Sequence, residues 1–211
     1  MGSVRSGRRE WGPIGTCALL RGVWPPGHLV RRGAYPRVVS TPVGSLIVRL
    51  AGPPDATSIG EISVVAWRAA YAAVMPHEYL ASLDANERAA RWVDGLTSPP
   101  PRSAVMVGEH DSRPVGFVAI GSCEGSDRTG EVNALNLRPD CWRHGFGSVL
   151  LKRGEEAMRA HGFTEAVLWV LPGNERARRF YEARGWRHDE MERDEVVHDI
   201  TVRETRYRRE L

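Results

Sequence analysis

Cysteine, lysine and long apolar runs are all scarce in this 211-residue sequence. The three cysteines, Cys17, Cys123 and Cys141, form no C-x-x-C pair, which excludes a disulfide scaffold and a thiolate-rich zinc site. No stretch reaches the roughly 18 to 20 apolar residues that a membrane-spanning helix needs. Lys152 is the only lysine among 29 basic residues, which we attribute to the codon usage of a GC-rich genome. We therefore expect a cytoplasmic protein that has no membrane partner.

The positive charge is concentrated at one end of the chain. Residues 1–44 contain seven arginines and one acidic residue, whereas residues 45–211 contain 22 basic and 25 acidic side chains. The net charge of +3 and the isoelectric point near 9.0 therefore arise from the first segment. Because the remainder is mildly acidic, these values do not indicate a nucleic-acid-binding domain, and we expect no nucleic-acid partner.

Residues 1–44 also contain eight glycines and five prolines, which leave no helical or strand periodicity. We predict a basic, mostly disordered extension here, followed by one folded domain at 45–211. Arg8-Arg9 could belong to a twin-arginine signal, although no adequate apolar core follows. Met1-Gly2 with Ser6 fits a myristoylation pattern, and the arginine-rich composition fits a transit peptide. A start codon assigned too far upstream would explain the segment equally well.

From residue 45 onward the pattern predicts alternating strands and helices. Apolar periodicity predicts helices from about Asp55 to Met75, from His77 to Gly95, and over 147–160 and 174–184. Strands are predicted at 45–50, 105–109, 115–120, 131–137, 166–171, 186–191 and 200–207, the second and third forming a hairpin. This order predicts a mixed α/β domain built around one buried sheet.

A glycine-containing loop lies between the strand at 131–137 and the helix at 147–160. A helix N-terminus offers unpaired backbone N–H groups and the positive end of the dipole, so it binds phosphate when no side chain blocks the approach. Gly145 and Gly147 remove the β-carbons at this point. The spacing is wrong for a P-loop, and Leu150 stands at the third position of the dinucleotide fingerprint. A tight turn that packs against its own sheet is the alternative.

A second motif follows one strand later, with Asn174, Ala177, Tyr181 and Gly185 in order. Together with Gly145 and Gly147, it resembles the GNAT superfamily of acyl-CoA-dependent N-acetyltransferases over roughly residues 45–211, and looks like a bacterial branch of it. The resemblance implies an α/β GNAT fold: a mixed, mostly antiparallel central sheet, splayed between the fourth and fifth strands, with helices on both faces. It also implies acetyl-CoA as cosubstrate and no metal.

The resemblance assigns roles to individual residues. The backbone of Leu135, Asn136 and Leu137 would contact the pantetheine arm and the acetyl carbonyl. Asn174 would contact pantetheine, and Tyr181 would protonate the departing thiolate. The diphosphate would be surrounded by six consecutive residues, Arg143, His144, Gly145, Phe146, Gly147 and Ser148.

Two positions depart from the family pattern. The family usually has Gln or Arg three residues before Gly145, where this chain has Trp142; we expect binding to survive because the diphosphate contacts are mainly backbone. Ribosomal-protein N-terminal acetyltransferases carry a Glu where this chain has Trp169, which argues against that subgroup.

The chemistry of amine acetylation requires a base. An aliphatic ammonium has a pKa near that of lysine, about 10.4, so at pH 7 forming the free amine costs about 4 to 5 kcal/mol. Glu131, at the start of its strand, suits a base acting through a water, although a solvated strand end is the alternative. Cys141 and His144 could form a nucleophilic pair, but direct transfer needs no covalent intermediate. The remaining histidines show no metal-ligand spacing.

We therefore expect an enzyme that transfers an acetyl group from acetyl-CoA to a primary amine by direct attack in a ternary complex. A small-molecule acceptor is favoured over a protein N-terminus. The alternative is a non-catalytic acyl-CoA-binding module with a regulatory role. The aromatic residues Trp67, Tyr71 and Tyr79 could either pack in the core or line the pocket for the acceptor. A homodimer is left open.

Overall fold

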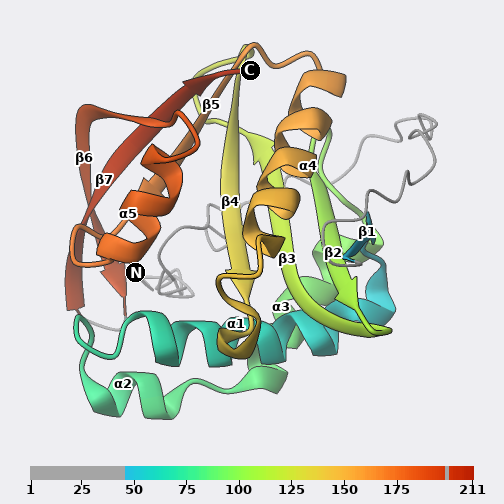
Figure 1. Cartoon of the computed structure of the whole chain (residues 1–211), viewed down its shortest axis with the longest axis vertical. Coiled ribbons are helices and arrows are strands. Elements are labelled where there is room, and N and C mark those ends of the chain that lie inside the picture. Colours follow the sequence, from blue (N-terminus) through green and yellow to red (C-terminus); the bar gives the residue numbers. More distant parts are fainter. Residues whose placement is uncertain (1–45, 198–199) are drawn as a thin grey trace, which may run out of the picture.

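The computed structural model describes residues 46–197 and 200–211, in which seven strands form one sheet with helices on both faces (Figure 1). The helices are α1 (Ala56–Ala70), α2 (His77–Ser82), α3 (Ala85–Thr97), α4 (Phe146–Ala160) and α5 (Glu175–Glu182). The strands are β1 (Ile47–Leu50), β2 (Ala104–His110), β3 (Arg113–Ser122), β4 (Thr129–Leu137), β5 (Glu165–Val170), β6 (Arg187–Val197) and β7 (Ile200–Glu210). Single 3₁₀ turns, η2 (Pro53–Asp55) and η3 (Pro139–Cys141), precede α1 and follow β4.

The sheet separates in its middle, between β4 and β5. The strand order is β1-β2-β3-β4-β5-β7-β6, and all neighbours are antiparallel except β4 and β5. These two parallel strands pair only at Thr129, Gly130 and Glu131, and beyond Glu131 they diverge. A register shift between Ala119 and Ile120 places one extra residue in β4 just after this point. The predicted mixed, splayed sheet is therefore confirmed.

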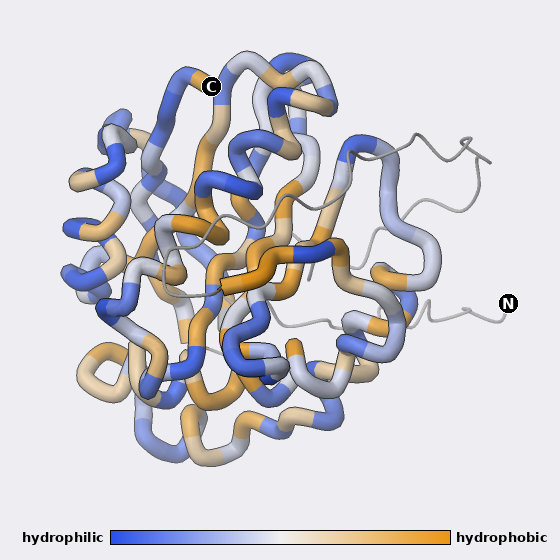
Figure 2. The backbone as a smooth tube through the Cα atoms, turned by 45° about the vertical axis from the view of Figure 1, so that its right-hand side comes forward, coloured by the Kyte–Doolittle hydropathy of each residue, from blue (hydrophilic) through white to orange (hydrophobic). Residues whose placement is uncertain are grey.

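Two apolar layers hold the helices on the sheet. On one face, Leu150 and Met158 of α4 pack with Val118, Ile120 and Val132 of the strands, and α5 joins the same layer. On the other face, α1 and α3 contribute Ile59, Ile62 and Leu96, which pack with Phe117 and Ala134. Figure 2 shows the strands of the interior as mostly hydrophobic segments, with hydrophilic segments outside them. Full burial of each large aliphatic side chain contributes about 1.5–3 kcal/mol, so the helices are fixed firmly beside the splay.

The predicted helix from His77 to Gly95 is wrong, because the chain forms two helices there. Leu83 adopts an extended conformation with ψ 122°, which ends α2. Asp84 then begins α3, and its side chain accepts a hydrogen bond from the backbone N–H of Glu87. Gly95 does not end this helix, which continues to Thr97. The preceding helix is also shorter than predicted, because it ends at Ala70 and a turn follows at Tyr71.

The last two strands extend beyond their predicted ends. Both strands are rich in charged residues, so the alternation of apolar and polar residues that predicts a strand is weak in the sequence. Ion pairs between the two strands accompany their pairing. Arg193 lies 2.7 Å from Glu204, and Arg203 lies 3.0 Å from Asp194. The hairpin formed by β2 and β3 is confirmed. The prediction for residues 1–44 lies outside the described residues.

Candidate active site

A pocket of about 580 Å³ occupies the gap that opens between β4 and β5. Its wall comes from the end of β4, the loop before α4, the first turn of α4, α5 and the end of α1. Nine residues predicted from the sequence line it: Leu135, Asn136, Leu137, Arg143, Gly145, Gly147, Ser148, Asn174 and Tyr181. Three others, Glu131, His144 and Phe146, do not line it. The splay thus brings two distant sequence motifs to one cavity.

The N-terminus of α4 faces this pocket. Gly145 is the N-cap, with φ +82°, in the left-handed region that favours glycine. Arg143 also has a positive φ, +69°, so the loop turns sharply on both sides of His144. The carbonyl oxygen of Gly145 accepts hydrogen bonds from Ser148 and Val149, which starts the helix. The first N–H groups of α4 have no partner within the helix, and this leaves donors for an anion.

The side chains of Phe146 and His144 do not line the pocket, unlike those of the neighbouring loop residues Arg143 and Ser148. The Phe146 side chain is buried in the core between α4 and the sheet and anchors the first turn. The His144 side chain is exposed, and its ring lies 5.8 Å from the Phe146 ring. Phe146 can therefore contact an anion at this helix end through its backbone N–H but not through its side chain.

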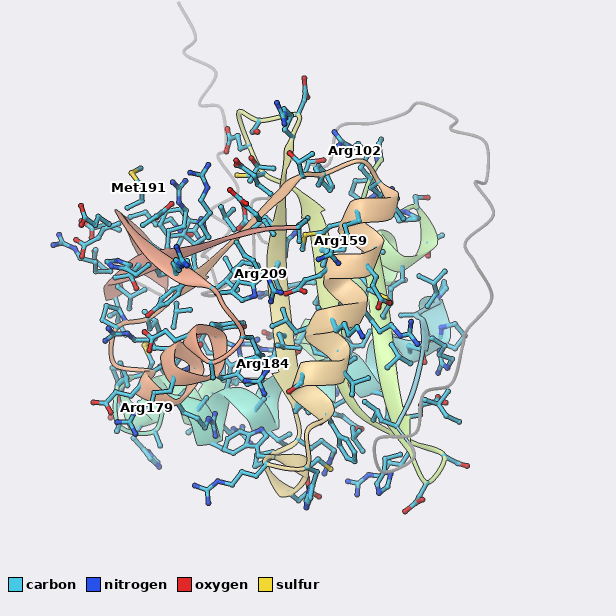
Figure 3. All side chains as sticks on the ribbon, turned by 45° about the horizontal axis from the view of Figure 1, so that its top comes forward. Arg102, Arg159, Arg179, Arg184, Met191 and Arg209 are labelled. Atoms are coloured by element: carbon cyan, nitrogen blue, oxygen red, sulfur yellow. The ribbon has the colours of Figure 1, made fainter. Side chains whose placement is uncertain are left out.

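Arg184, at the C-terminal side of α5, connects that helix to the N-terminus of α4. Its Nε donates to the Ser148 hydroxyl at 2.9 Å, and its Nη1 donates to the carbonyl oxygen of Phe180 at 2.7 Å. The guanidinium carbon lies 3.8 Å from the centre of the Phe180 ring. Figure 3 shows Arg184 between α5 and α4. Burial lowers the pKa of Arg184, so this charge stands in a partly dehydrated environment.

Trp142 and Arg176 meet across the pocket from different elements. The Arg176 guanidinium carbon, from the first turn of α5, lies 3.3 Å from the centre of the Trp142 ring. The Trp142 indole N–H donates to the carbonyl oxygen of Leu137 at 3.0 Å, which fixes the ring beside the end of β4. Desolvation lowers the pKa of Arg176, and the nearby charge of Arg143 lowers it further. Both side chains line the pocket.

Tyr181 lies in the inner wall of the pocket, at the end of α5. Its side chain is buried, with ring contacts to Phe180, Trp186 and Tyr207. Burial raises the pKa of Tyr181 above its ordinary value, and the neighbouring Tyr71 raises it further. The hydroxyl therefore keeps its proton at neutral pH. A buried phenol that faces a pocket can donate that proton to a leaving group.

Asn174 begins α5 and also borders the pocket. Its side-chain oxygen accepts a hydrogen bond from the backbone N–H of Ala177 at 3.1 Å, so it caps the helix. This local role accounts for the amide oxygen, whereas the predicted contact with pantetheine stays a prediction.

Glu131 lies at the point where β4 and β5 separate, and it does not line the pocket. It is the last β4 residue that pairs with β5, opposite Val167, and its side chain is buried. Its charge helps to raise the pKa of the Cys123 thiol, after the larger effect of burial. Asn133, two residues further along, is also buried, and its side-chain oxygen has no hydrogen-bond partner within the described part of the chain. Glu131 thus lies at the apex of the splay, and its role as a base stays a prediction.

Cys141 lacks the features of a reactive nucleophile. Burial raises the pKa of its thiol, and the neighbouring Asp140 raises it further. A higher pKa means less thiolate at neutral pH. This disfavours the nucleophilic pair with His144.

The aromatic stripe of α1 and α2 belongs to the core. Trp67, Tyr71 and Tyr79 are buried and pack with Met75 and Leu171. The Trp67 and Tyr71 ring centres are 4.6 Å apart. Tyr71 has a second role, because it also lines the pocket.

No group of three or more His, Cys, Asp or Glu within 46–197 and 200–211 is placed to hold a metal ion. In the same part of the chain, no helix is both long enough and apolar enough to cross a membrane.

Trp142, Arg176 and Arg184 are pocket residues that the sequence motifs did not assign to the site. Trp142 stands out in the sequence only as a departure from the family pattern, and the two arginines lie in an arginine-rich segment at 176–184. The spacing of the two arginines from Asn174 and Gly185 does not by itself predict a role in binding or catalysis. Only the three-dimensional contacts across the splay identify them.

Comparison with known proteins agrees with this geometry. Residues 54–186 match the model of the acetyltransferase (GNAT) family. The chain is 32% identical over 132 residues to the uncharacterized N-acetyltransferase YuaI of Bacillus subtilis, covering 60% of this chain and 72% of that protein. It is likewise 32% identical over 135 residues to the uncharacterized N-acetyltransferase Rv2669 of Mycobacterium tuberculosis, covering 62% of this chain and 84% of that protein.

Solved structures share the fold at low sequence identity. The PaiA N-acetyltransferase from Thermoplasma acidophilum, in complex with coenzyme A, matches with a TM-score of 0.66 and 19% identity, over 79% of this chain and 99% of that one. A GCN5-related N-acetyltransferase from Rhodopseudomonas palustris matches with a TM-score of 0.63 and 20% identity, over 88% of this chain and 100% of that one. The chain therefore belongs to the acetyltransferase (GNAT) family of acyltransferase enzymes.

Proposed function

We propose that this protein transfers an acetyl group from acetyl-CoA to a primary amine by direct attack in a ternary complex, without a covalent acyl-enzyme intermediate. The observation that carries the proposal is the pocket in the splay, which joins an open helix N-terminus to a buried tyrosine hydroxyl. An anionic diphosphate suits the first end, and a departing thiolate suits the second. Acetyl-CoA contains both groups, joined by the pantetheine arm.

The diphosphate would lie at the N-terminus of α4. The backbone of Gly145, Phe146 and Gly147 would offer N–H donors, while Arg143 and His144 would add side-chain donors at the exposed rim. Ser148 would contribute through its hydroxyl, which Arg184 already orients. The match to a structure solved with coenzyme A supports this placement at the level of the fold.

The pantetheine arm would run along the end of β4. Beyond Glu131 this strand has no β5 partner, so its backbone groups on that side are open to a ligand. Leu135, Asn136 and Leu137 line the pocket and would pair with the amides of the arm. Asn174 would contact the arm from the opposite wall.

Tyr181 would protonate the thiolate as the tetrahedral intermediate collapses. Glu131, at the point where the two strands separate, would take a proton from the substrate ammonium through a water, and the free amine so formed would attack the thioester. Its position outside the pocket suits an acceptor that approaches from the other side of the splay. We favour a small-molecule amine over a protein N-terminus, and we place the protein in the cytoplasm.

A CoA-dependent thermal shift tests the cofactor assignment. Ligand at 100 times its dissociation constant adds about 2.7 kcal/mol to the free energy of unfolding, so CoA at millimolar concentration should raise the melting temperature. No shift with CoA or acetyl-CoA would contradict the proposal. The second candidate function, a non-catalytic acyl-CoA sensor, shares this shift but predicts no acetyl transfer to any amine.

A further inference from the structure

Two arginines that line the pocket stack on aromatic rings. Arg176 lies over the Trp142 ring at 3.3 Å, and Arg184 lies over the Phe180 ring at 3.8 Å. Neither forms an ion pair with a carboxylate in residues 46–197 or 200–211, whereas Arg179, Arg206 and Arg208 each lie 2.6–2.8 Å from an Asp or Glu side chain. An aromatic ring attracts a guanidinium through its face but carries no net charge. The full positive charge of both groups therefore remains available to a ligand in the pocket.

Arg176 is the less constrained of the two. Arg184 already donates to Ser148 and to the Phe180 carbonyl oxygen. For Arg176, by contrast, the side chain stacks on Trp142 and makes no hydrogen bond or ion pair within residues 46–197 and 200–211. Its in-plane N–H groups are thus free to donate to an anion, because a ring occupies only the face of the guanidinium.

The ring that seats Arg176 is itself held in place. The indole N–H of Trp142 donates to the carbonyl oxygen of Leu137, at the end of β4. Arg176 comes from α5, on the far side of the splay. The contact therefore spans the gap between the two halves of the sheet. It lies close to Arg143, whose charge lowers the pKa of Arg176.

We propose that Trp142 and Arg176 act as one phosphate-binding unit, in which the indole ring of Trp142 positions the Arg176 guanidinium to bind a phosphate group of the cofactor. This inference rests on the proposed use of CoA. It explains how a loop with Trp142, where the family usually has Gln or Arg, still presents a strong donor at this position. The donor comes from α5 instead of the loop, and a planar guanidinium suits the paired oxygens of a phosphate.

The first test measures the dissociation constant of CoA for three single variants. Arg176→Met removes the charge but keeps an unbranched side chain of similar reach, and we expect the dissociation constant to rise about tenfold to hundredfold, as for the loss of a charge-assisted hydrogen bond. Trp142→Leu should raise the dissociation constant of CoA by a smaller factor, because the Arg176 guanidinium remains but no longer stacks on a ring that positions it. The control is Arg179→Met, on the outer side of α5 and paired with Glu175 at 2.6 Å (Figure 3). It should change the constant by less than about twofold.

The second test asks whether the two residues act together. In the Arg176→Met background, Trp142→Leu should weaken CoA binding by no more than about twofold, because the ring then has no guanidinium to position. Salt supplies an independent readout. Raising NaCl from about 50 mM to about 500 mM should weaken CoA binding less in Arg176→Met than in the wild type, because one screened charge contact is gone.

Three results would overturn the inference while leaving CoA binding by the wild type intact. They are an unchanged dissociation constant in Arg176→Met, effects of the two substitutions that simply add, and a salt dependence equal to that of the wild type. Failure of the wild type to bind CoA would instead contradict the proposed function. The melting temperatures of the unliganded variants show whether each is folded, and Arg176→Lys, which keeps the charge without the planar fork, should bind CoA with intermediate affinity.

Discussion

Gly147 and Phe180 approach so closely that a β-carbon added at Gly147 would lie 3.2 Å from Cε2 of Phe180. Gly147 belongs to the first turn of α4 and Phe180 to α5, so the contact joins the two helices that border the pocket. Glycine here allows α5 to pack against the helix end and keeps that end open. The close packing of α5 and the open end of α4 thus depend on the same missing side chain.

The first prediction compares two glycines of α4. Gly147→Ala should weaken CoA binding at least about tenfold, because the methyl group crowds Phe180 and the open helix end. Gly154→Ala is the control: its β-carbon would also meet side-chain atoms at 3.2 Å, those of Val118 and Ile120, but away from the pocket. It should alter the melting temperature and leave the dissociation constant of CoA unchanged. Equal CoA affinity in both variants would show that the phosphate lies elsewhere.

The second prediction concerns Tyr181 as the acid. Tyr181→Phe keeps the buried ring and removes only the hydroxyl, so CoA binding should persist while turnover falls by about 10² to 10⁴. Raising the pH should not restore the rate, because the missing group is a proton donor. Steady-state rates with an identified amine between pH 6 and pH 9, together with CoA affinity, provide the measurement. Wild-type turnover in the variant would remove Tyr181 from the mechanism.

The third prediction concerns the stability of the folded protein at alkaline pH. Burial raises the pKa of Tyr181 in the folded state, whereas an unfolded tyrosine ionises near pH 10. The unfolded chain therefore loses its proton first, and the free energy of unfolding should fall as the pH rises above about 10. The free energy of unfolding of Tyr181→Phe should fall less steeply with pH. Part of the pH dependence remains in this variant, because the pKa values of Tyr79 and Tyr207 are also raised. Urea unfolding at pH 8 and at about pH 11 measures the difference; parallel losses in both proteins would contradict it.

The fourth prediction concerns Glu131 as the base. Glu131→Gln should reduce turnover most at low pH, where the amine is most protonated, and raising the pH should partly restore it. This pattern is opposite to that expected for Tyr181→Phe, so the two roles are separable. A uniform loss at every pH would indicate that Glu131 supports the structure of the splay instead.

The sequence predicted the elements that local chemistry determines. Gly145, in the left-handed conformation before α4, and Gly185, with φ +80° after α5, mark turns that only a few residue types adopt readily. The break between α2 and α3 was missed, although Asp84 and Glu87 form a recognisable N-terminal pair, because apolar periodicity continues through Leu83. The strands β6 and β7 were predicted too short because their charged residues pair across the hairpin.

The site was predictable only in part, for a physical reason. The backbone groups near Gly145, Gly147 and Leu135 follow from the motif, because spacing along the chain sets their positions. The roles we propose for Trp142 and Arg176 depend on a contact between segments more than thirty residues apart, which no local pattern encodes. Glu131 was predicted on the right strand, but its place outside the pocket depends on where the two strands diverge.

Amine-dependent release of the CoA thiol from acetyl-CoA tests the central proposal most directly. A panel of primary amines, from small metabolites to short peptides, should include at least one that accelerates thiol release by the wild type and yields the N-acetylated product by mass spectrometry. Tyr181→Phe should bind CoA equally well and release thiol about 10² to 10⁴ times more slowly with the same amine. If the wild type binds acetyl-CoA but forms no acetylated product with any amine of the panel, the protein is an acyl-CoA-binding module and the proposed enzyme mechanism is wrong.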